Sequence, residues 1–170
     1  MAKSVTSAFS EFLRDSVNLD PSDTQKARNS RDNLIGNLNS FSGHDGFFVI
    51  YDSKNLKFGS FARRTKIRPI DDIDIILCFS AEETRKYVET SSGIDIIASE
   101  NDKQNGLLID GINYLNSTKV INRCIKKLSE LRDYSKAELH KKQEAAILKL
   151  KSYTWYFDIV PCFTQIQICN

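Results

Sequence analysis

The run DIDIILCF, residues 72–79, constrains the fold more than any other part of the sequence. Two acids alternate with isoleucines at its start, and an unbroken apolar stretch completes it. Because strand side chains alternate between faces, Asp72 and Asp74 share one face while Ile73 and Ile75 share the other. The run therefore predicts a buried strand that fixes two carboxylates side by side.

Such a carboxylate pair is unfavourable by itself. Two like charges about 4 Å apart repel by on the order of 4 kcal/mol at an effective dielectric constant of about 20. Binding of Mg²⁺ or Mn²⁺ would remove this repulsion, because hard cations take oxygen ligands. The plain alternative is two solvent-facing acids at the start of a strand.

A glycine–serine pair and a basic segment precede the acids, in GSFARRTKIRPIDD. Gly59 lets backbone N–H groups approach an oxyanion closely, and Ser60 adds a hydroxyl donor. Four basic residues follow within nine positions and would suit polyphosphate: Arg63, Arg64, Lys66 and Arg68. An ordinary turn followed by a solvated basic loop is the alternative interpretation.

A third acid, Asp158, lies inside the apolar segment WYFDIVP, residues 155–161. A buried acid without a partner is costly, so this residue needs either a basic partner or a bound cation. If it joins Asp72 and Asp74, three carboxylates could hold two divalent ions about 4 Å apart, as in-line phosphoryl or nucleotidyl transfer requires.

Periodicity and turn signals predict a mixed α/β domain rather than a regular βαβ series. We expect helices over 4–17, 21–41 and 117–133, and strands over 47–51, 72–79, 145–150 and 153–160. The sequence Ser80-Ala81-Glu82-Glu83 fits a capping box and predicts a short helix after the buried strand. Residues 91–112 show no assignable pattern.

Composition excludes several classes of protein. The net charge of +2 is small for a dedicated duplex-binding domain, so a sequence-specific nucleic-acid reader is the weakest alternative. No apolar run is long enough for a membrane span, and no signal peptide is visible. Four cysteines without C-x-x-C spacing indicate free thiols in the reducing cytoplasm. Two histidines make a histidine-ligated zinc site or a serine–histidine–aspartate triad improbable.

Taken together, these motifs resemble the nucleotidyltransferase fold of the DNA polymerase β superfamily. GSFARRTKIRPIDDIDIIL is similar to the pattern G-S-[FY]-x-R-x-T-x-I-R-P-x-x-D-I-D of bacterial cyclic-oligonucleotide synthases. FDIVPCF is similar to their I/V-D-V-V-P-A-F element, and the resemblance extends over most of the chain. One departure is Arg64, which stands where many family members have glycine.

The resemblance implies a catalytic lobe in which a mixed sheet carries the acids and packs against N-terminal helices. It implies one domain over residues 1–170, with the helices in 1–45 and the core in 46–170. The implied metal ligands for two Mg²⁺ or Mn²⁺ ions are Asp72, Asp74 and Asp158. The implied phosphate-binding residues are Gly59, Ser60 and Arg63, with Arg68 as an alternative to Arg63.

The implied reaction joins ribonucleoside triphosphates, such as ATP or GTP, into a cyclic di- or oligonucleotide and releases pyrophosphate. In the family this product is a second messenger that activates an effector against bacteriophage. Family members are about twice as long and continue into a helical lobe, whereas this chain ends nine residues after Pro161. We therefore expect a catalytic lobe without that helical lobe. An inactive remnant or nucleotide-binding module is one alternative, and a nucleotidyltransferase acting on RNA, an antibiotic or a toxin–antitoxin target is another.

Overall fold

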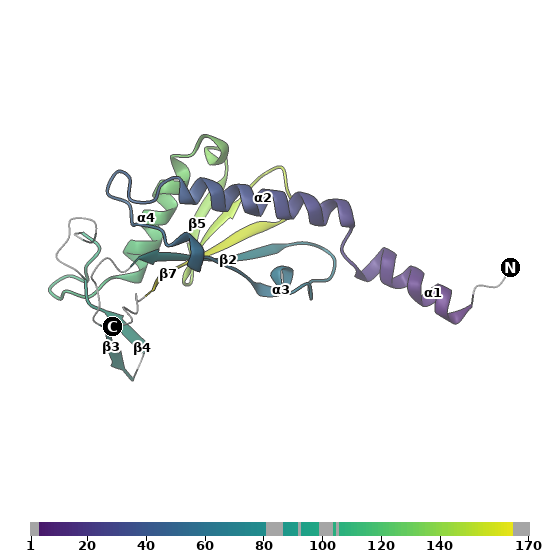
Figure 1. Cartoon of the computed structure of the whole chain (residues 1–170), viewed down its shortest axis with the longest axis horizontal. Helices are drawn as coiled ribbons and strands as arrows, with labels where there is room; N and C mark the ends of the chain where they lie inside the picture. The colour runs from purple at the N-terminus through teal and green to yellow at the C-terminus, as the bar shows by residue number, and fades with distance from the viewer. Residues whose placement is uncertain (1–3, 81–86, 92, 99–103, 105, 165–170) are drawn as a thin grey trace.

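The computed structural model describes residues 4–80, 87–91, 93–98, 104 and 106–164. Its centre is a five-stranded mixed sheet with the strand order β1-β2-β7-β6-β5 (Figure 1). Strands β2 and β7 are parallel, and the other three neighbouring pairs are antiparallel. The strands are β1 (Leu56–Phe58), β2 (Asp72–Ser80), β5 (Glu138–Lys142), β6 (Ala145–Lys149) and β7 (Tyr156–Thr164). The predicted mixed α/β class is confirmed.

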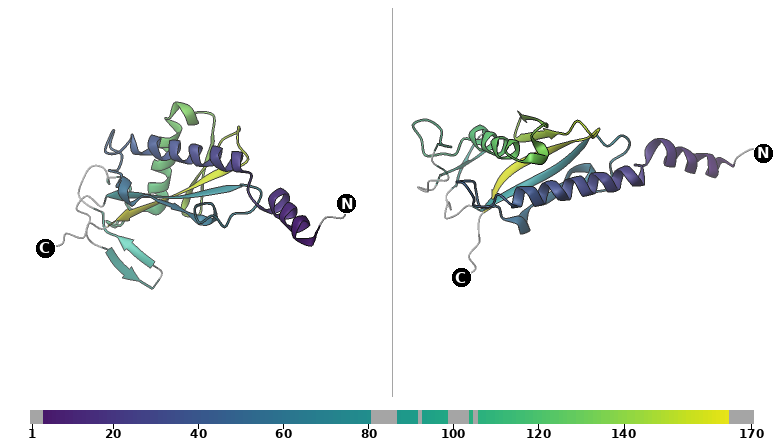
Figure 2. Two further views of the ribbon diagram at one scale, coloured as in Figure 1. Left: turned by 45° about the vertical axis from the view of Figure 1, so that its right-hand side comes forward. Right: turned by 90° about the horizontal axis from the view of Figure 1, so that it is seen from above.

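One face of this sheet forms the hydrophobic core. Ile73, Ile75, Leu77 and Phe79 of β2 are each at most 1% exposed, as are the isoleucine and phenylalanine that flank Asp158 on β7. The predicted alternation of β2 is therefore confirmed, because its isoleucines face the core and its acids do not. Helices α2 (Pro21–Asn39) and α4 (Ser117–Ser129) lie on one side of the sheet (Figures 1 and 2).

Helix α2 begins as the sequence predicts. The Asp20 side chain accepts hydrogen bonds from the backbone N–H groups of Ser22 and Asp23, and Pro21 occupies the first helical position. Leu34 and Leu38 are fully buried in the core. The helix ends at Asn39, two residues before the predicted end.

Helix α4 begins at Ser117, as predicted, but ends before the predicted position 133. The side chain of Asn116 caps its N-terminus and accepts a hydrogen bond from the backbone N–H of Lys119. The helix ends at Ser129, and a 3-10 turn over Arg132–Tyr134 takes up the remaining predicted length. Its inner face is apolar, because Ile121, Cys124 and Leu128 are buried and Ile125 and Leu131 pack against the core.

The first helix, α1, has an apolar face that no described residue covers. It runs over Val5–Phe12 and continues as a π-helical turn to Val17, which matches the predicted extent. It extends away from the sheet (Figures 1 and 2), and Val5, Phe9 and Phe12 are 88%, 59% and 55% exposed. Among the described helices, none has the length and apolar character that spanning a membrane would need.

The predicted strand over 47–51 is wrong. Its apolar residues are buried as a strand's would be, but only one isolated bridge, Ile50 to Phe79, joins it to β2. The bridge consists of the Tyr51 N–H bonded to the Cys78 carbonyl and the Ser80 N–H bonded to the Val49 carbonyl. The Phe47 N–H instead donates to the His44 carbonyl in a local turn, so the ladder does not extend toward Phe47. Burial explains the apolar pattern, and local hydrogen bonds prevent the strand.

Other differences concern the edges of the fold. The helix predicted after Ser80 falls on residues 81–86, which lie outside the described residues. From Tyr87 the chain forms a separate hairpin, β3 (Tyr87–Thr90) and β4 (Gly93–Ile96). The outer strands β1 and β5 carry no clear apolar alternation, and the sequence did not predict them. A charged edge strand such as ELHKK of β5 is typical of sheet edges exposed to water.

Candidate active site

The three predicted acids come together on the face of the sheet opposite the core. Asp72 and Asp74 lie on β2 and Asp158 lies on β7, where Asp74 and Asp158 are directly paired across the parallel ladder. Neighbouring strands are about 4.8 Å apart, so these two carboxylates are adjacent. Asp72 is opposite Tyr156, one pair earlier on the same face.

Asp158 is partly buried and lacks a partner on one oxygen. Its Oδ1 atom is buried and accepts no hydrogen bond from the described residues. Burial raises the pKa of the Asp158 carboxyl, and the charge of Asp74 raises it further, whereas Lys142 and His140 lower it. The alternative in which a basic residue pairs with Asp158 is therefore not what the described contacts show.

The pKa of the Asp74 carboxyl is also raised, by burial and by a neighbouring acid. Burial raises the pKa of its carboxyl, and the charge of Asp72 adds to this, while Lys66 and Arg63 lower it. The ionised forms of both paired acids are therefore disfavoured in this chain without a cation beside them.

The glycine–serine turn lies directly against Asp74. Phe58, the last residue of β1, pairs with Asp74, and Gly59 then begins the short helix α3 (Gly59–Ala62). Gly59 has φ +72°, and a Cβ atom there would lie 1.7 Å from Oδ2 of Asp74. Only glycine therefore allows this turn and this acid to be in contact.

Two of the basic residues have different surroundings. The Arg63 guanidinium lies 5.7 Å from the centre of the Phe58 ring, and its charge lowers the pKa of the Asp74 carboxyl. The Arg68 side chain instead donates to the carbonyl oxygens of Arg14 and Asp15, at 3.3 and 3.2 Å, where the first helical segment ends. Arg68 thus anchors that segment, which leaves Arg63 as the better candidate for phosphate.

The backbone conformation at Arg64 shows why many family members have glycine at this position. The φ of Arg64 is +61°, in the left-handed region that glycine adopts without cost. The glycine of the family pattern therefore matches a backbone requirement, which this chain meets with an arginine.

Lys66 is a site residue whose position the sequence did not reveal. Its ammonium group forms ion pairs with both Asp71 and Asp72, and its side chain is only 14% exposed. In the sequence it was only one of four basic residues in a loop. Within the described part of the chain, no three acidic, cysteine or histidine side chains form a ready-made metal cluster.

The same face of β2 and β7 carries a pair of thiols. Cys78 and Cys162 are opposite each other, with their Sγ atoms 3.0 Å apart, and Cys78 Sγ also donates to the carbonyl oxygen of Lys54. Burial raises the pKa of Cys162 to about 12, and its hydrogen bond with Cys78 contributes. Cys78, Cys124 and Cys162 are free thiols, and Cys169 lies outside the described residues.

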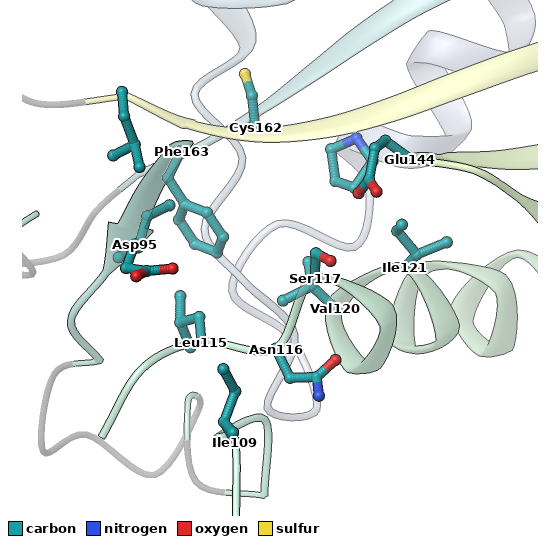
Figure 3. Close-up of a pocket in the computed structure, with 13 residues that line it drawn as sticks. Asp95, Ile109, Leu115, Asn116, Ser117, Val120, Ile121, Glu144, Cys162 and Phe163 are labelled. Carbon is teal, nitrogen blue, oxygen red and sulfur yellow. The ribbon is translucent and has the colours of Figure 1, made fainter. Parts of the chain in front are cut away.

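A cavity of about 620 Å³ lies away from the acids, where β7, β4 and the start of α4 meet (Figure 3). Its lining is mainly apolar, with Phe163, Val120 and Leu115, and it includes the carboxylates of Asp95 and Glu144. None of the predicted site residues lines it. It is therefore separate from the acid cluster.

Comparison with known proteins agrees with this geometry. No protein-family model matches the sequence. The chain is 45% identical over 166 residues to a curated protein of Bacillus cereus (strain VD146) named "Probable cyclic nucleotide synthase". That alignment covers 96% of this chain and 50% of the relative, so the chain spans about half the length of the curated protein it matches.

The fold resembles solved structures of CdnC from E. coli MS115-1. One is the complex with HORMA-deltaN, with a TM-score of 0.59 and 14% identity, and the other is CdnC with ATP, with a TM-score of 0.60 and 16% identity. Each match covers 95% of this chain and 42% of the CdnC chain. These findings agree with the resemblance inferred from the motifs: the chain has the fold of the CdnC structures and is similar to a curated protein named as a probable cyclic nucleotide synthase.

Proposed function

We propose that this chain is the catalytic lobe of a metal-dependent nucleotidyltransferase that joins ribonucleoside triphosphates into a cyclic di- or oligonucleotide and releases pyrophosphate. The observation that carries the proposal is the set of three carboxylates on one face of β2 and β7, with Gly59 in contact with Asp74. This arrangement combines a cation site with a turn suited to phosphate.

The acids fit a divalent cation. All the donors are carboxylate oxygens, which Mg²⁺ and Mn²⁺ prefer, and one of them is the buried, unpartnered Oδ1 of Asp158. Burial and a neighbouring carboxylate raise the pKa of both Asp74 and Asp158, and a bound cation would offset both effects. We assign Asp72, Asp74 and Asp158 as ligands for two ions. When bound, such ions stabilise the attacking and leaving oxygens of an in-line displacement.

The other residues would bind and orient the substrate. Backbone N–H groups at Gly59 and Ser60 would hold the outer phosphates of the donor nucleotide, and Arg63 would balance their charge. Asp158 would lie at the position where the 3′-hydroxyl of the second nucleotide loses its proton. Attack of that hydroxyl on the donor α-phosphate forms the new ester bond, and pyrophosphate leaves.

The comparisons support the choice of substrate and product. The curated relative is named for cyclic nucleotide synthesis, and a structural neighbour was solved with ATP. ATP and GTP are therefore the first substrates to test. We propose the family's role for the product as well: a second messenger that activates an effector in antiphage defence within the cytoplasm.

The test is mass spectrometry of products after the chain is incubated with all four ribonucleoside triphosphates and Mg²⁺ or Mn²⁺. A phosphatase-resistant cyclic product from the wild type, and none from Asp72→Asn/Asp74→Asn, would support the proposal. Asp52→Asn is the matched control, because Asp52 is an exposed acid outside this cluster. Transfer only to an added RNA or antibiotic would favour the alternative acceptors.

A binding measurement separates an inactive remnant from an active enzyme. A ligand at 100 times its dissociation constant adds about 2.7 kcal/mol to the free energy of unfolding. We expect Mg²⁺ with ATP or GTP to raise the melting temperature of the wild type but not of Asp72→Asn/Asp74→Asn. Stabilisation without any product would indicate a nucleotide-binding module, and equal shifts in both proteins would refute the metal assignment.

A further inference from the structure

The Lys66 ammonium group bridges two neighbouring carboxylates at the start of β2. It forms ion pairs with Asp71 and with Asp72, and only Asp72 belongs to the three assigned ligands. The Lys66 side chain is 14% exposed and that of Asp72 is 28% exposed, so this contact is partly withdrawn from water. An ion pair in such a place is weakened less by solvent than one on the surface.

This contact competes directly with metal binding. A carboxylate oxygen held by an ammonium group is not available to a hard cation without loss of that bond. Lys66 also supplies positive charge to a cluster in which Asp74 and Asp158 are adjacent. In the metal-free chain, the lysine therefore compensates part of the charge that a metal ion would compensate.

We propose that Lys66 is an internal counter-ion of the acid cluster, and that a metal ion binds by replacing the Lys66 ammonium group at Asp72. This inference rests on the proposed function, because it assumes the metal site described there. It gives Lys66 a positioning role: it holds Asp72 in place before loading and sets how tightly the ion binds.

Asp71 makes this exchange feasible. Its side chain is 58% exposed, and it is the second partner of Lys66. When Asp72 turns to the metal, Lys66 keeps Asp71 as a partner, so no buried ammonium group is left unpaired. Asp71 therefore acts on the metal site through Lys66 and not as a ligand.

The experiment measures binding of Mn²⁺ alone to the full chain, without nucleotide, by electron paramagnetic resonance of the free ion. Lys66→Met removes the competing ammonium group, and we expect Mn²⁺ to bind on the order of tenfold more tightly. Asp71→Asn leaves Lys66 with Asp72 as its only partner, and we expect binding roughly threefold weaker. Lys66→Gln provides a second variant if Lys66→Met does not fold.

A double-mutant cycle separates the replacement of the Lys66 ammonium group by a metal ion from a simple effect of the Asp71 charge. If Asp71 acts through Lys66, Asp71→Asn has no effect on Mn²⁺ affinity in the Lys66→Met background. If Asp71 acts only by its charge, Asp71→Asn weakens binding equally in both backgrounds, and the exchange is refuted. Lys57→Met is the matched control, because Lys57 lies on β1 but pairs with Asp32 at 2.9 Å rather than with an assigned ligand.

The failure of this inference and that of the proposed function give different results. Loss of Mn²⁺ binding in Asp74→Asn, with unchanged or weaker binding in Lys66→Met, would overturn the role of Lys66 and leave the metal site intact. Unchanged Mn²⁺ binding in Asp74→Asn/Asp158→Asn would overturn the metal site and the role of Lys66 together.

Discussion

Strands β2 and β7 carry two matched pairs of side chains on the same face, four residues apart. Asp74 pairs with Asp158, and Cys78 pairs with Cys162, in one continuous parallel ladder. The backbone geometry of the two pairs is the same, and only the side-chain chemistry differs. The thiols hydrogen-bond to each other at 3.0 Å. By contrast, burial and the charge of Asp74 raise the pKa of the Asp158 carboxyl, and one Asp158 oxygen has no partner among the described residues.

The difference between the two pairs shows that closeness of two side chains is not enough to make a ligand site. Neutral thiols can hydrogen-bond to one another, so the cysteine pair needs no ligand to satisfy its polar atoms. Ionised carboxylates cannot satisfy one another, and they require positive charge from outside the ladder. Lys66 supplies part of that charge through its ion pair with Asp72. We therefore expect a cation to bind at the acid pair rather than at the thiol pair.

The strongest test of this comparison replaces each pair in turn. Asp74→Asn or Asp158→Asn should lower the rate of nucleotide product formation by about 10³-fold or more, because several kcal/mol of charge stabilisation are lost. Cys78→Ala/Cys162→Ala should leave the rate per folded molecule unchanged. Product formation is followed by pyrophosphate release, and a similar loss in both variants would show that the two pairs are not functionally distinct.

The second test concerns the reactivity of the thiols. Because the pKa of Cys162 is about 12, its thiolate is scarce near neutral pH, and alkylation should be at least about 100-fold slower than in the urea-unfolded chain. Peptide mass spectrometry after timed exposure to iodoacetamide measures this rate for Cys162 separately. Fast alkylation in the folded state would contradict the raised pKa and would mean that the thiol pair, like the acid pair, is not satisfied by its own hydrogen bonds.

The third test breaks the contact between the turn and the acid pair. Gly59→Ala should destabilise the fold and move Asp74, because a left-handed φ costs about 1–2 kcal/mol without glycine and the new Cβ meets a carboxylate oxygen. Gly46→Ala is the matched control, since Gly46 has φ +70° and open space around its Cβ position. Urea unfolding of both variants separates the clash from the φ cost, and equal losses would show that the contact with Asp74 is unimportant.

The smallest expected effect is the pH dependence of metal-free stability. Asp74 and Asp158 have pKa values above the ordinary 3.8, so the folded chain binds more protons than the unfolded chain just above that pH. Their contribution to stability therefore falls as pH rises from 3.8 through the raised values, and is constant above them. In Asp158→Asn, the free energy of unfolding should fall less over this pH range, as measured by urea unfolding with a chelator present. An identical fall in wild type and variant would argue against the raised pKa.

The sequence predicted the acid cluster because alternation and burial are local properties. Two acids spaced by one residue must share a strand face, and an acid inside an apolar strand must meet something polar. That Asp158 joins the other two acids was a hypothesis from its place in an apolar strand, and the family resemblance implied it as well. Its direct pairing with Asp74 was not predicted. What Asp72, Asp74 and Asp158 bind remains a prediction.

Other features depend on contacts that the sequence does not display. The ion pairs of Lys66 require knowledge of where a loop folds back, and the capture of Arg68 by the first helical segment joins residues more than 50 positions apart. The segment 47–51 has the composition of a strand, but the Phe47 N–H, which would extend its pairing with β2, donates to the His44 carbonyl in a local turn. Edge strands β1 and β5 are held by pairing with a neighbour rather than by their own apolar pattern.

The parallel pairing of β2 with β7 also determines when the site can exist during synthesis. Paired positions such as Cys78 and Cys162 are 84 residues apart in the chain, so this ladder closes a long loop. Non-local pairing of this kind is slow compared with helix formation. On the ribosome, the glycine turn and the first two acids emerge long before Asp158. A nascent chain that ends before β7 therefore cannot assemble the acid cluster. The acid cluster is thus one of the last features of the described fold to form.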